Sequence, residues 1–278
     1  MTITIHSGAF QNHIKKLPKG SVDLLVTDPP YLLDAQGGGA FAGENRTYDK
    51  EFKGFSDGIT NDDLDLIMSR MSQVNAYIWC NKAQLRQYLD YFDDIGCNFD
   101  VLTWHKSNPV PRCNNKYLSD TEYVVFARDK GVPLGGSYAT LGKYWVTPIN
   151  QKDKERYGHP TIKPLDIIRT LISNSSAPGD LVMDPFLGSG TTAVACVLED
   201  RNFWGCELDP SYYQISMQRV AEAKSELRSG KKSTKTVQMG LDGVPLDKPI
   251  KPRPTVAAKK PKIKSKDKKP LIRRVGKR

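Results

Sequence analysis

The sequence predicts an α/β protein with a doubly wound, mostly parallel sheet. Short apolar runs alternate with amphipathic segments over residues 1–228, and this alternation is typical of a parallel sheet covered on both faces. The stretch LVMDPFLGSGTTAVAC places a glycine-rich turn between an expected strand and an expected helix. Such turns are frequent in β-α-β units. A hydrophobic content of 38% in 278 residues suffices for a packed core.

Each expected strand is a short apolar run, and each expected helix is a longer amphipathic segment. In chain order they are Val22–Thr27 (strand), Asp62–Val74 (helix), Ala76–Trp79 (strand), Lys82–Ile95 (helix), Val101–Trp104 and Tyr123–Ala127 (strands), Pro164–Asn174 (helix), Leu181–Met183 (strand), Gly190–Glu199 (helix), Phe203–Cys206 (strand) and Pro210–Arg228 (helix). Leu33–Gly58 and Pro133–Gly158 show neither pattern. Loops of this length are usually functional or mobile.

Charge divides the chain into two parts. Residues 229–278 carry 17 Lys and Arg against three acidic residues, a balance of +14, which leaves −4 for residues 1–228 out of the net +10. The basic segment has few apolar residues and many Lys and Pro, so we predict a disordered tail after the domain 1–228. Such asymmetry favours a polyanionic partner or a solubilising extension.

Cysteine, histidine and hydropathy patterns argue against several classes of protein. The five cysteines contain no CxxC pair and the four histidines lack metal-ligand spacing, so neither a disulfide framework nor a metal site is expected. No run approaches the ~20 apolar residues of a membrane span. The N-terminal MTITIHSGAF also lacks the layout of a signal peptide. We therefore expect a cytoplasmic protein with no membrane partner.

Residues 181–213 have the features of a nucleotide-binding β-α-β unit. One expected strand runs into Asp184, Gly188 and Gly190 form the turn into a helix, and the next strand ends at Glu207. Glycines let a backbone approach a ligand, and an acid at the end of the second strand can bind ribose hydroxyls. An ordinary α/β turn is the alternative, but it leaves the two acids unexplained.

The same stretch also fits the GxGxxA pattern of dinucleotide oxidoreductases, through Gly188, Gly190 and Ala193. Nothing in the sequence resembles the second, substrate-orienting domain that such enzymes need. Asp184 would repel a pyrophosphate, whereas it suits a cationic group such as the α-ammonium of S-adenosylmethionine. The sequence therefore favours S-adenosylmethionine over a dinucleotide.

The stretch LLVTDPPY places Asp28, Pro29, Pro30 and Tyr31 at the end of the first expected strand. Ligands bind at the carboxyl ends of strands in open α/β sheets. Proline holds the preceding residue in an extended conformation and has no N–H to donate. The segment therefore presents hydrogen-bond acceptors only, beside the flat ring of Tyr31. A turn that merely ends the strand is the alternative.

An acceptor-only segment suits a substrate that brings two donors, such as the exocyclic amino group of a nucleobase. The lone pair of that nitrogen is delocalised into the ring, so it is a poor nucleophile. Two acceptors that hold its protons out of plane would favour a pyramidal nitrogen with a free lone pair. Positioning and fixed negative charge could then promote attack on a sulfonium methyl group, without a metal.

These segments resemble the motifs of β-class DNA amino-methyltransferases. The stretch 28–31 (DPPY) resembles the catalytic tetrapeptide, and 184–192 (DPFLGSGTT) resembles the donor-binding motif. The catalytic motif comes first, which is the permuted β-class order. The stretches 159–164 (HPTIKP), 104–109 (WHKSNP) and 121–123 (TEY) are similar to further motifs. The resemblance spans about Thr2–Arg228 and implies a Rossmann-like fold that uses S-adenosylmethionine.

The resemblance implies a role for each matching position. Asp28 and the Pro29 carbonyl would bind the target amino group, and Tyr31 would stack on the extruded base. Pro30 would complete the catalytic tetrapeptide. The residues implied to bind S-adenosylmethionine are Thr161, Lys163, Asp184, Phe186, Gly188, Gly190 and, at the ribose, Glu207. An acid at the first tetrapeptide position usually marks N6-adenine enzymes, whereas serine usually marks N4-cytosine enzymes.

Two positions depart from the family pattern. Ile162 stands where many members carry Gln, which removes a polar contact. Gly8 stands about where the first strand usually ends in Asp, so only a backbone contact to the donor's base could survive there. Tyr77, Trp79, Tyr88 and Tyr91 are assigned to core packing rather than to base stacking.

Double-stranded DNA is the implied partner, and the target base must leave the stack at a cost of ~a few kcal/mol. Contacts to DNA are expected from a basic, irregular stretch; a solvated loop explains each residue about equally well. These residues are Lys106, Asn108, Arg112 and Lys116. A short target-recognition insert is expected at about 132–158, helped by the Leu33–Gly58 loop (Arg46, Lys53), the tail or a second subunit. A homodimer and a cognate restriction endonuclease stay open as partners.

The sequence thus predicts a site-specific DNA methyltransferase, encoded by a bacterium or a phage and acting at the nucleoid, that modifies adenine N6. N4-cytosine transfer is the nearest alternative. Methylation of RNA or of a protein amide is more distant, because Asn often replaces the acid in those enzymes. A DNA-binding module without turnover is the alternative from another class, and intact Asp28 and Tyr31 argue against it.

Overall fold

The computed structural model describes residues 1–32, 58–109, 117–158 and 162–230. These residues all belong to one compact unit, which spans Met1–Lys248. Several expectations lie outside the described residues: most of the Leu33–Gly58 loop with Arg46 and Lys53, the DNA contacts Arg112 and Lys116, the donor contact Thr161, and the tail from residue 231.

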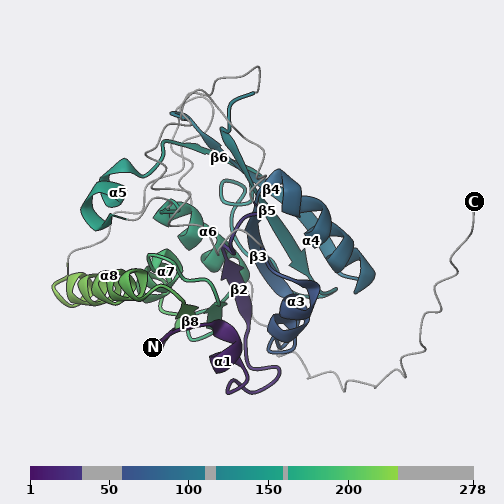
Figure 1. The fold of residues 1–278 in the computed structure, drawn as a ribbon, viewed down its shortest axis with the longest axis horizontal. Coiled ribbons are helices and arrows are strands. Elements are labelled where there is room, and N and C mark those ends of the chain that lie inside the picture. Colours follow the sequence, from purple (N-terminus) through teal and green to yellow (C-terminus); the bar gives the residue numbers. More distant parts are fainter. Residues whose placement is uncertain (33–57, 110–116, 159–161, 231–278) are drawn as a thin grey trace, which may run out of the picture. The chain divides into compact units, whose positions relative to one another are not determined.

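The described residues form an eight-stranded sheet in the order β1-β8-β7-β2-β3-β5-β4-β6 (Figure 1). The strands are β1 (Ile3–Ser7), β2 (Leu24–Thr27), β3 (Asn75–Cys80), β4 (Asn98–Lys106), β5 (Thr121–Arg128), β6 (Tyr144–Thr147), β7 (Leu181–Asp184) and β8 (Asn202–Glu207). Neighbouring strands are parallel except where β5 pairs with β3 and β4. The predicted doubly wound, mostly parallel sheet is confirmed.

Helices cover both faces of this sheet (Figure 1). They are α1 (Phe10–Ile14), α3 (Asn61–Met68), α4 (Lys82–Asp94), α5 (Gln151–Tyr157), α6 (Leu165–Ser175), α7 (Thr191–Leu198) and α8 (Pro210–Arg228). One apolar cluster joins α6, α7 and α8 to Leu24 and Val26, and a second joins α1, α3 and α4 to Leu25. Successive strand residues point to opposite faces, so β2 contributes to both clusters.

The central strands are buried throughout, which makes the middle of the sheet rigid. All residues of β2 and β3 are buried, as expected for parallel strands covered on both faces. Complete burial of a Leu or Val side chain contributes about 1.5–3 kcal/mol. Leu25→Ala would therefore cost about 2–5 kcal/mol of stability. The loop that follows β2 starts from this fixed support.

The structure adds four elements that the sequence did not predict: β1, α1, β6 and α5. The expectation of an irregular segment over 133–158 was wrong, because β6 pairs with β4 and Asn150 caps α5 by accepting a hydrogen bond from the Asp153 backbone N–H. The expected helix 62–74 ends early, at Met68. The residues that follow do not continue the helix, because the Ser72 backbone N–H donates to the Val22 carbonyl at 2.7 Å.

The sheet reverses its winding between β2 and β7. These two strands pair directly, with Leu24 opposite Val182. From β2 the next strand lies on one side, at β3, whereas from β7 the next strand lies on the other side, at β8. Ligands of open α/β sheets bind in the crevice at such a switch point. The loops that carry the two quoted motifs begin there.

The described part of the chain has no helix that could span a membrane, no metal-binding group and no disulfide. None of its helices has the length and apolar character needed to cross a bilayer. It holds no group of His, Cys, Asp and Glu that could bind a metal ion. The four cysteines within it, Cys80, Cys97, Cys196 and Cys206, are free and buried.

Candidate active site

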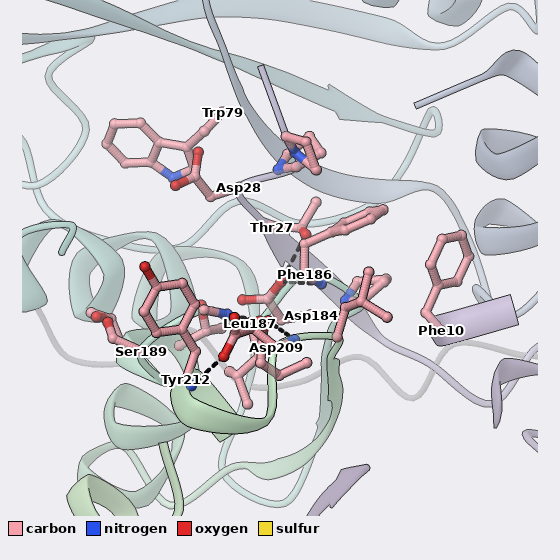
Figure 2. A pocket seen from close by; sticks show the side chains of 18 of the residues that line it. Phe10, Thr27, Asp28, Trp79, Asp184, Phe186, Leu187, Ser189, Asp209 and Tyr212 are labelled. Carbon is pink, nitrogen blue, oxygen red and sulfur yellow. Dashed lines mark hydrogen bonds between the residues drawn. The ribbon is translucent and has the colours of Figure 1, made fainter. Parts of the chain in front are cut away.

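A pocket of about 790 Å³ lies at the carboxyl ends of β2, β7 and β8. It is lined by residues 28–31 after β2, 184–189 after β7 and 207–209 after β8, with further residues from α1 and α8. Figure 2 shows Asp28 and Trp79 toward the top of this pocket and Asp209 and Tyr212 toward the bottom. Tyr31 and Glu207 both line it, so the two motifs share one cavity.

Two side-chain amides at the start of α4 hold the loop 28–32 by donating hydrogen bonds to its carbonyls. The prolines of the loop have no N–H to donate in return. The side-chain amide of Gln84 donates to the Pro30 carbonyl at 2.8 Å, and that of Asn81 donates to the Leu32 carbonyl at 2.7 Å. Asn81 also caps α4 through the Ala83 backbone N–H. The stretch 28–31 is therefore fixed from the side of the helix.

One oxygen of the Asp28 carboxylate is paired and the other is not. Oδ2 accepts a hydrogen bond from Lys163 Nζ at 2.6 Å. Oδ1 is buried and has no hydrogen-bond partner among the described residues. Burial raises the pKa of Asp28 above its ordinary value, although the Lys163 ammonium acts in the opposite direction. A buried acceptor without a donor is costly, so this atom marks a place where a ligand N–H would fit.

Lys163 stands at the centre of a charged cluster. Its Nζ lies 3.1 Å from Glu122 Oε2 and donates to the Tyr31 hydroxyl at 3.3 Å. The same nitrogen lies 5.2 Å from the ring centroid of Tyr31 and 5.1 Å from that of Trp79. The resemblance implied a place for Lys163 near the donor, which stays a prediction; in the structure its ammonium contacts the Asp28 carboxylate.

Lys106 belongs to the same cluster. Its Nζ lies 2.6 Å from Glu122 Oε1, and its side chain is only 18% exposed. Burial opposes ionisation of Glu122, but Lys163 and Lys106 together lower its pKa to about 2. Burial also disfavours the Lys163 ammonium, yet the two carboxylates raise its pKa. Lys106 was expected to face DNA; the structure gives it a buried carboxylate as its partner.

Asp184 joins the glycine-rich loop after β7 to β2. Its Oδ1 accepts hydrogen bonds from Thr27 Oγ1 at 2.7 Å and from the Phe186 backbone N–H at 3.1 Å, and both bonds are drawn in Figure 2. The residue is 2% exposed and still lines the pocket. Burial raises its pKa to about 7. Asp184 therefore has a structural role beside any contact with a ligand.

Glu207 shapes the glycine turn from the neighbouring strand. Its Oε2 accepts from the Gly188 backbone N–H at 2.6 Å, and its Oε1 accepts from the Asp209 N–H at 2.8 Å. Burial raises the pKa of this carboxyl. The predicted pairing of the glycine turn with the acid at the end of the next strand is thus present in space.

The two glycines of the turn serve different purposes. Gly188 has φ 55° and lines the pocket. Gly190 has φ 87° and is not among the lining residues. A Cβ on Gly190 would lie 2.8 Å from Ser216 Cβ and 2.9 Å from Ser216 Cα, in α8. The sequence interpretation of a close approach to ligand fits Gly188, whereas Gly190 permits a close approach of α8.

Sequence reasoning missed several residues of the site. Arg219 of α8 is buried and donates through Nη1 to Ser189 O at 2.8 Å, Ser189 Oγ at 2.9 Å and Thr191 Oγ1 at 3.1 Å. Trp79, assigned to the core, is fully buried yet lines the pocket. Only the Asp-Pro pair that begins α8 signalled a contribution from that helix; nothing in the sequence marks Arg219, because its role depends on packing.

The expected DNA-binding residues do not form one surface in the described structure. Asn108 uses its side-chain oxygen to accept from the Ile149 backbone N–H at 2.7 Å. Lys106 points into the charged cluster. Arg112 and Lys116 lie outside the described residues, as does the donor contact Thr161.

The pocket fits a cationic ligand of nucleotide size. Among the described residues that line it, five are acidic and one is basic: Asp28, Glu122, Asp184, Glu207 and Asp209 against Lys163. Its volume lies in the range of about 300–1,000 Å³ that is typical of cofactor sites. S-adenosylmethionine carries a sulfonium and an ammonium, so the charge and size of the pocket agree with this donor.

Comparisons with known proteins show which family the chain resembles. The N6/N4 methyltransferase family, described as DNA methylase, matches residues 22–218. The Type II methyltransferase M2.MboI of Moraxella bovis is 28% identical over 248 residues, covering 81% of this chain and 90% of its own. The Type II methyltransferase M2.DpnII of Streptococcus pneumoniae is 28% identical over 245 residues, with 81% and 91% covered.

Two solved structures show the same fold. The M1.HpyAVI–SAM complex matches with a TM-score of 0.61 and 27% identity, covering 79% of this chain and 99% of that chain. The cytosine-N4-specific PvuII DNA methyltransferase matches with a TM-score of 0.61, covering 83% and 94%. At 16% identity, the latter likeness supports the fold alone.

Proposed function

The chain belongs to the DNA methylase family of N6 and N4 methyltransferases, and we propose that it methylates the N6 amino group of adenine in duplex DNA. The observation that carries the proposal is Asp28 Oδ1, a buried acceptor without a partner among the described residues. It lies in the pocket that the donor loop also lines. An exocyclic amino group would supply the missing donor.

Asp28 and the Pro29 carbonyl would accept the two amino protons, and Tyr31 would stack on the base. S-adenosylmethionine supplies an electrophilic methyl group: the nitrogen lone pair forms the N–C bond while the electrons of the C–S bond stay on sulfur. The nitrogen then carries a positive charge, which the Asp28 carboxylate stabilises. Asp28 is also the acceptor placed to take the proton that this nitrogen loses.

The donor would be held at the other end of the pocket. Asp184, Glu207 and the loop residues Phe186 and Gly188 line that end. The negative carboxylates suit the ammonium of the donor and its ribose hydroxyls. Gly190 supports this end indirectly, through its packing against Ser216. Thr161 stays a prediction, and Lys163 acts at the target end.

Adenine is favoured over cytosine by the acid in the tetrapeptide. A carboxylate is purely an acceptor, whereas a serine hydroxyl also donates. The resemblance associates the acid with N6 transfer. The likeness to the cytosine-N4-specific PvuII enzyme concerns the fold, so it leaves this preference unchanged.

Recognition of DNA would involve the insert at 132–158 beside the pocket. The insert contributes the edge strand β6, and Tyr138 within it is 93% exposed. Exposed aromatic and polar side chains there, with Asn108, Arg112 and Lys116, could contact an opened duplex. The basic tail would add affinity that depends on salt.

Sequencing with detection of modified bases tests the proposal, on DNA from cells that express the protein. We expect N6-methyladenine in one short sequence context. Asp28→Ala should abolish the mark while calorimetry still shows binding of S-adenosylmethionine, and Asp94→Ala, on an exposed turn of α4, should change neither. N4-methylcytosine would establish the alternative function. A mark that persists in Asp28→Ala would remove Asp28 from the reaction.

A further inference from the structure

Lys163 holds one oxygen of the carboxylate to which the proposed substrate must bind, while the other oxygen, Oδ1, has no partner among the described residues. Its ammonium donates to Asp28 Oδ2 at 2.6 Å and lies about equally far from the rings of Tyr31 and Trp79, at 5.2 and 5.1 Å. A nitrogen donor on this carboxylate, between aromatic rings, has the chemistry expected of the target amino group. The lysine on Oδ2 and the base on Oδ1 would therefore share the negative charge of Asp28, an inference that rests on the proposed function.

The charge of Lys163 matters during the reaction. Positive charge develops on the amino nitrogen, and a carboxylate beside it stabilises that charge. An ammonium that kept its contact with Asp28 would share the carboxylate and repel the new charge. Lys163 therefore needs a second counter-ion when the base is bound.

Glu122 has the position and the charge for this role. Its Oε2 already lies 3.1 Å from Lys163 Nζ. Its Oε1 lies 2.6 Å from Lys106 Nζ, which fixes the other side of the carboxylate. Glu122 also belongs to β5, where it lies opposite Trp104 of β4, so sheet pairing fixes its backbone position. Its side chain is 16% exposed, which limits screening by water.

We propose that Glu122 is a positioning residue for methyl transfer. When the target amino group binds Asp28, Glu122 becomes the counter-ion of the Lys163 ammonium. The hydrogen bond of the ammonium passes from Asp28 to Glu122, and no covalent bond changes. Lys106 holds Glu122 in place, and the Tyr31 hydroxyl donates to Glu122 Oε2 at 3.2 Å. The exchange of partners leaves Asp28 free and keeps Lys163 neutralised.

Two substitutions separate the charge of Glu122 from its shape. Glu122→Gln keeps the shape and removes the charge, whereas Glu122→Asp keeps the charge and shortens the side chain. We expect Glu122→Gln to lower kcat on the order of 10-fold or more, and Glu122→Asp to lower it less. The KM for the donor and the affinity for DNA should stay within about twofold. A purely structural role predicts the opposite order.

kcat and KM would be measured in steady-state assays with labelled S-adenosylmethionine and plasmid DNA from a host without adenine methylation, and single turnovers would isolate the chemical step. Glu199→Gln is the matched control. Glu199 forms an ion pair with Arg169 at 2.8 Å, its side chain is 9% exposed, and it does not line the pocket. Its loss should lower thermal stability without changing the rate of the folded protein.

Lys106→Met supplies a second variant that does not alter the Glu122 side chain. If Lys106 anchors Glu122, the substitution lowers kcat and leaves the salt dependence of DNA binding unchanged. If Lys106 instead contacts a phosphate, DNA binding weakens and its salt slope falls by about 1. The second result would overturn the anchoring role, because the ammonium would then not be held by Glu122.

The outcomes distinguish this inference from the proposed function. A wild-type protein that methylates no adenine refutes the proposed function itself. A wild-type protein that methylates adenine, with Glu122→Gln as fast as Glu122→Asp or faster, refutes the role of Glu122 alone. Unchanged kcat in Glu122→Gln and Lys106→Met together would also refute it.

Discussion

Asp184→Asn tests whether the buried Asp184 carboxylate lowers the stability of the folded protein. The carboxylate is 2% exposed, and burial raises its pKa from 3.8 to about 7. The folded protein therefore binds a proton more tightly than the unfolded chain does. Stability is full below about pH 4, falls as pH rises to about 7, and is constant above that.

The size of the effect follows from this pKa. Each pKa unit corresponds to about 1.4 kcal/mol, so ionised Asp184 costs the native state about 4 kcal/mol above pH 7. Asn has no such cost, and its side-chain oxygen can still accept from Thr27 and from the Phe186 N–H. Between pH 5 and pH 8 the variant should gain about 3 kcal/mol relative to wild type. That gain corresponds to roughly 6–12 °C in Tm.

Thermal unfolding followed by circular dichroism at pH 5, 6, 7 and 8 would measure this difference. Other titrating groups are common to both proteins and cancel in the comparison. Asp94→Asn, at an exposed position on the last turn of α4, is the surface control for the effect of an Asp-to-Asn substitution on Tm. Binding of S-adenosylmethionine to Asp184→Asn should weaken by roughly 10- to 100-fold, the cost of one charge-assisted hydrogen bond. A Tm difference that is the same at all four pH values would refute the reasoning.

Three further predictions concern packing, positioning and the tail. Gly190→Ala should cost roughly 2–5 kcal/mol, since a left-handed φ and a Cβ 2.8 Å from Ser216 both oppose it. Gly179→Ala, with φ 89° and no atom near its Cβ, should cost only about 1–2 kcal/mol in the same chemical denaturation assay, and equal costs would contradict the packing role. Arg219→Gln should weaken donor binding in calorimetry, because Ser189 and Thr191 lose three hydrogen bonds, while an unchanged Kd would leave Arg219 a purely structural residue. Deletion of residues 229–278 should flatten the salt dependence of DNA binding, by ~0.9 in log–log slope per lost phosphate contact, and should spare the single-turnover rate; an unchanged slope would remove the tail from DNA binding.

The hydrophobic pattern of the sequence predicted the strands that lie in the middle of the sheet. The strands β2, β3, β5, β7 and β8 are apolar runs buried on both faces, so their composition identifies them without tertiary information. The edge strands β1 and β6 are only partly buried and depend on pairing with β8 and β4. Their weaker patterns explain why the sequence did not reveal them.

The candidate site was predictable where chemistry follows from adjacent residues. Asp28, Pro29 and Tyr31 are adjacent, so the sequence alone predicts one acceptor-rich loop, and the structure places all three in the lining of the pocket. The cluster of Lys163, Glu122 and Lys106 was not predictable, because it joins residues from separate elements whose distances depend on the packed sheet. A lysine in a family motif suggested a donor contact, and only the structure revealed its carboxylate partners.

Strand adjacency, rather than order along the chain, brings the chemistry together. Thr27 and Asp184 are 157 positions apart, yet they share a hydrogen bond because β2 pairs with β7. The segment between them can differ in length without separating the two loops, as long as this pairing persists. The permuted motif order is therefore compatible with a common site: the target loop and the donor loop leave the same edge of the sheet, on strands about 5 Å apart.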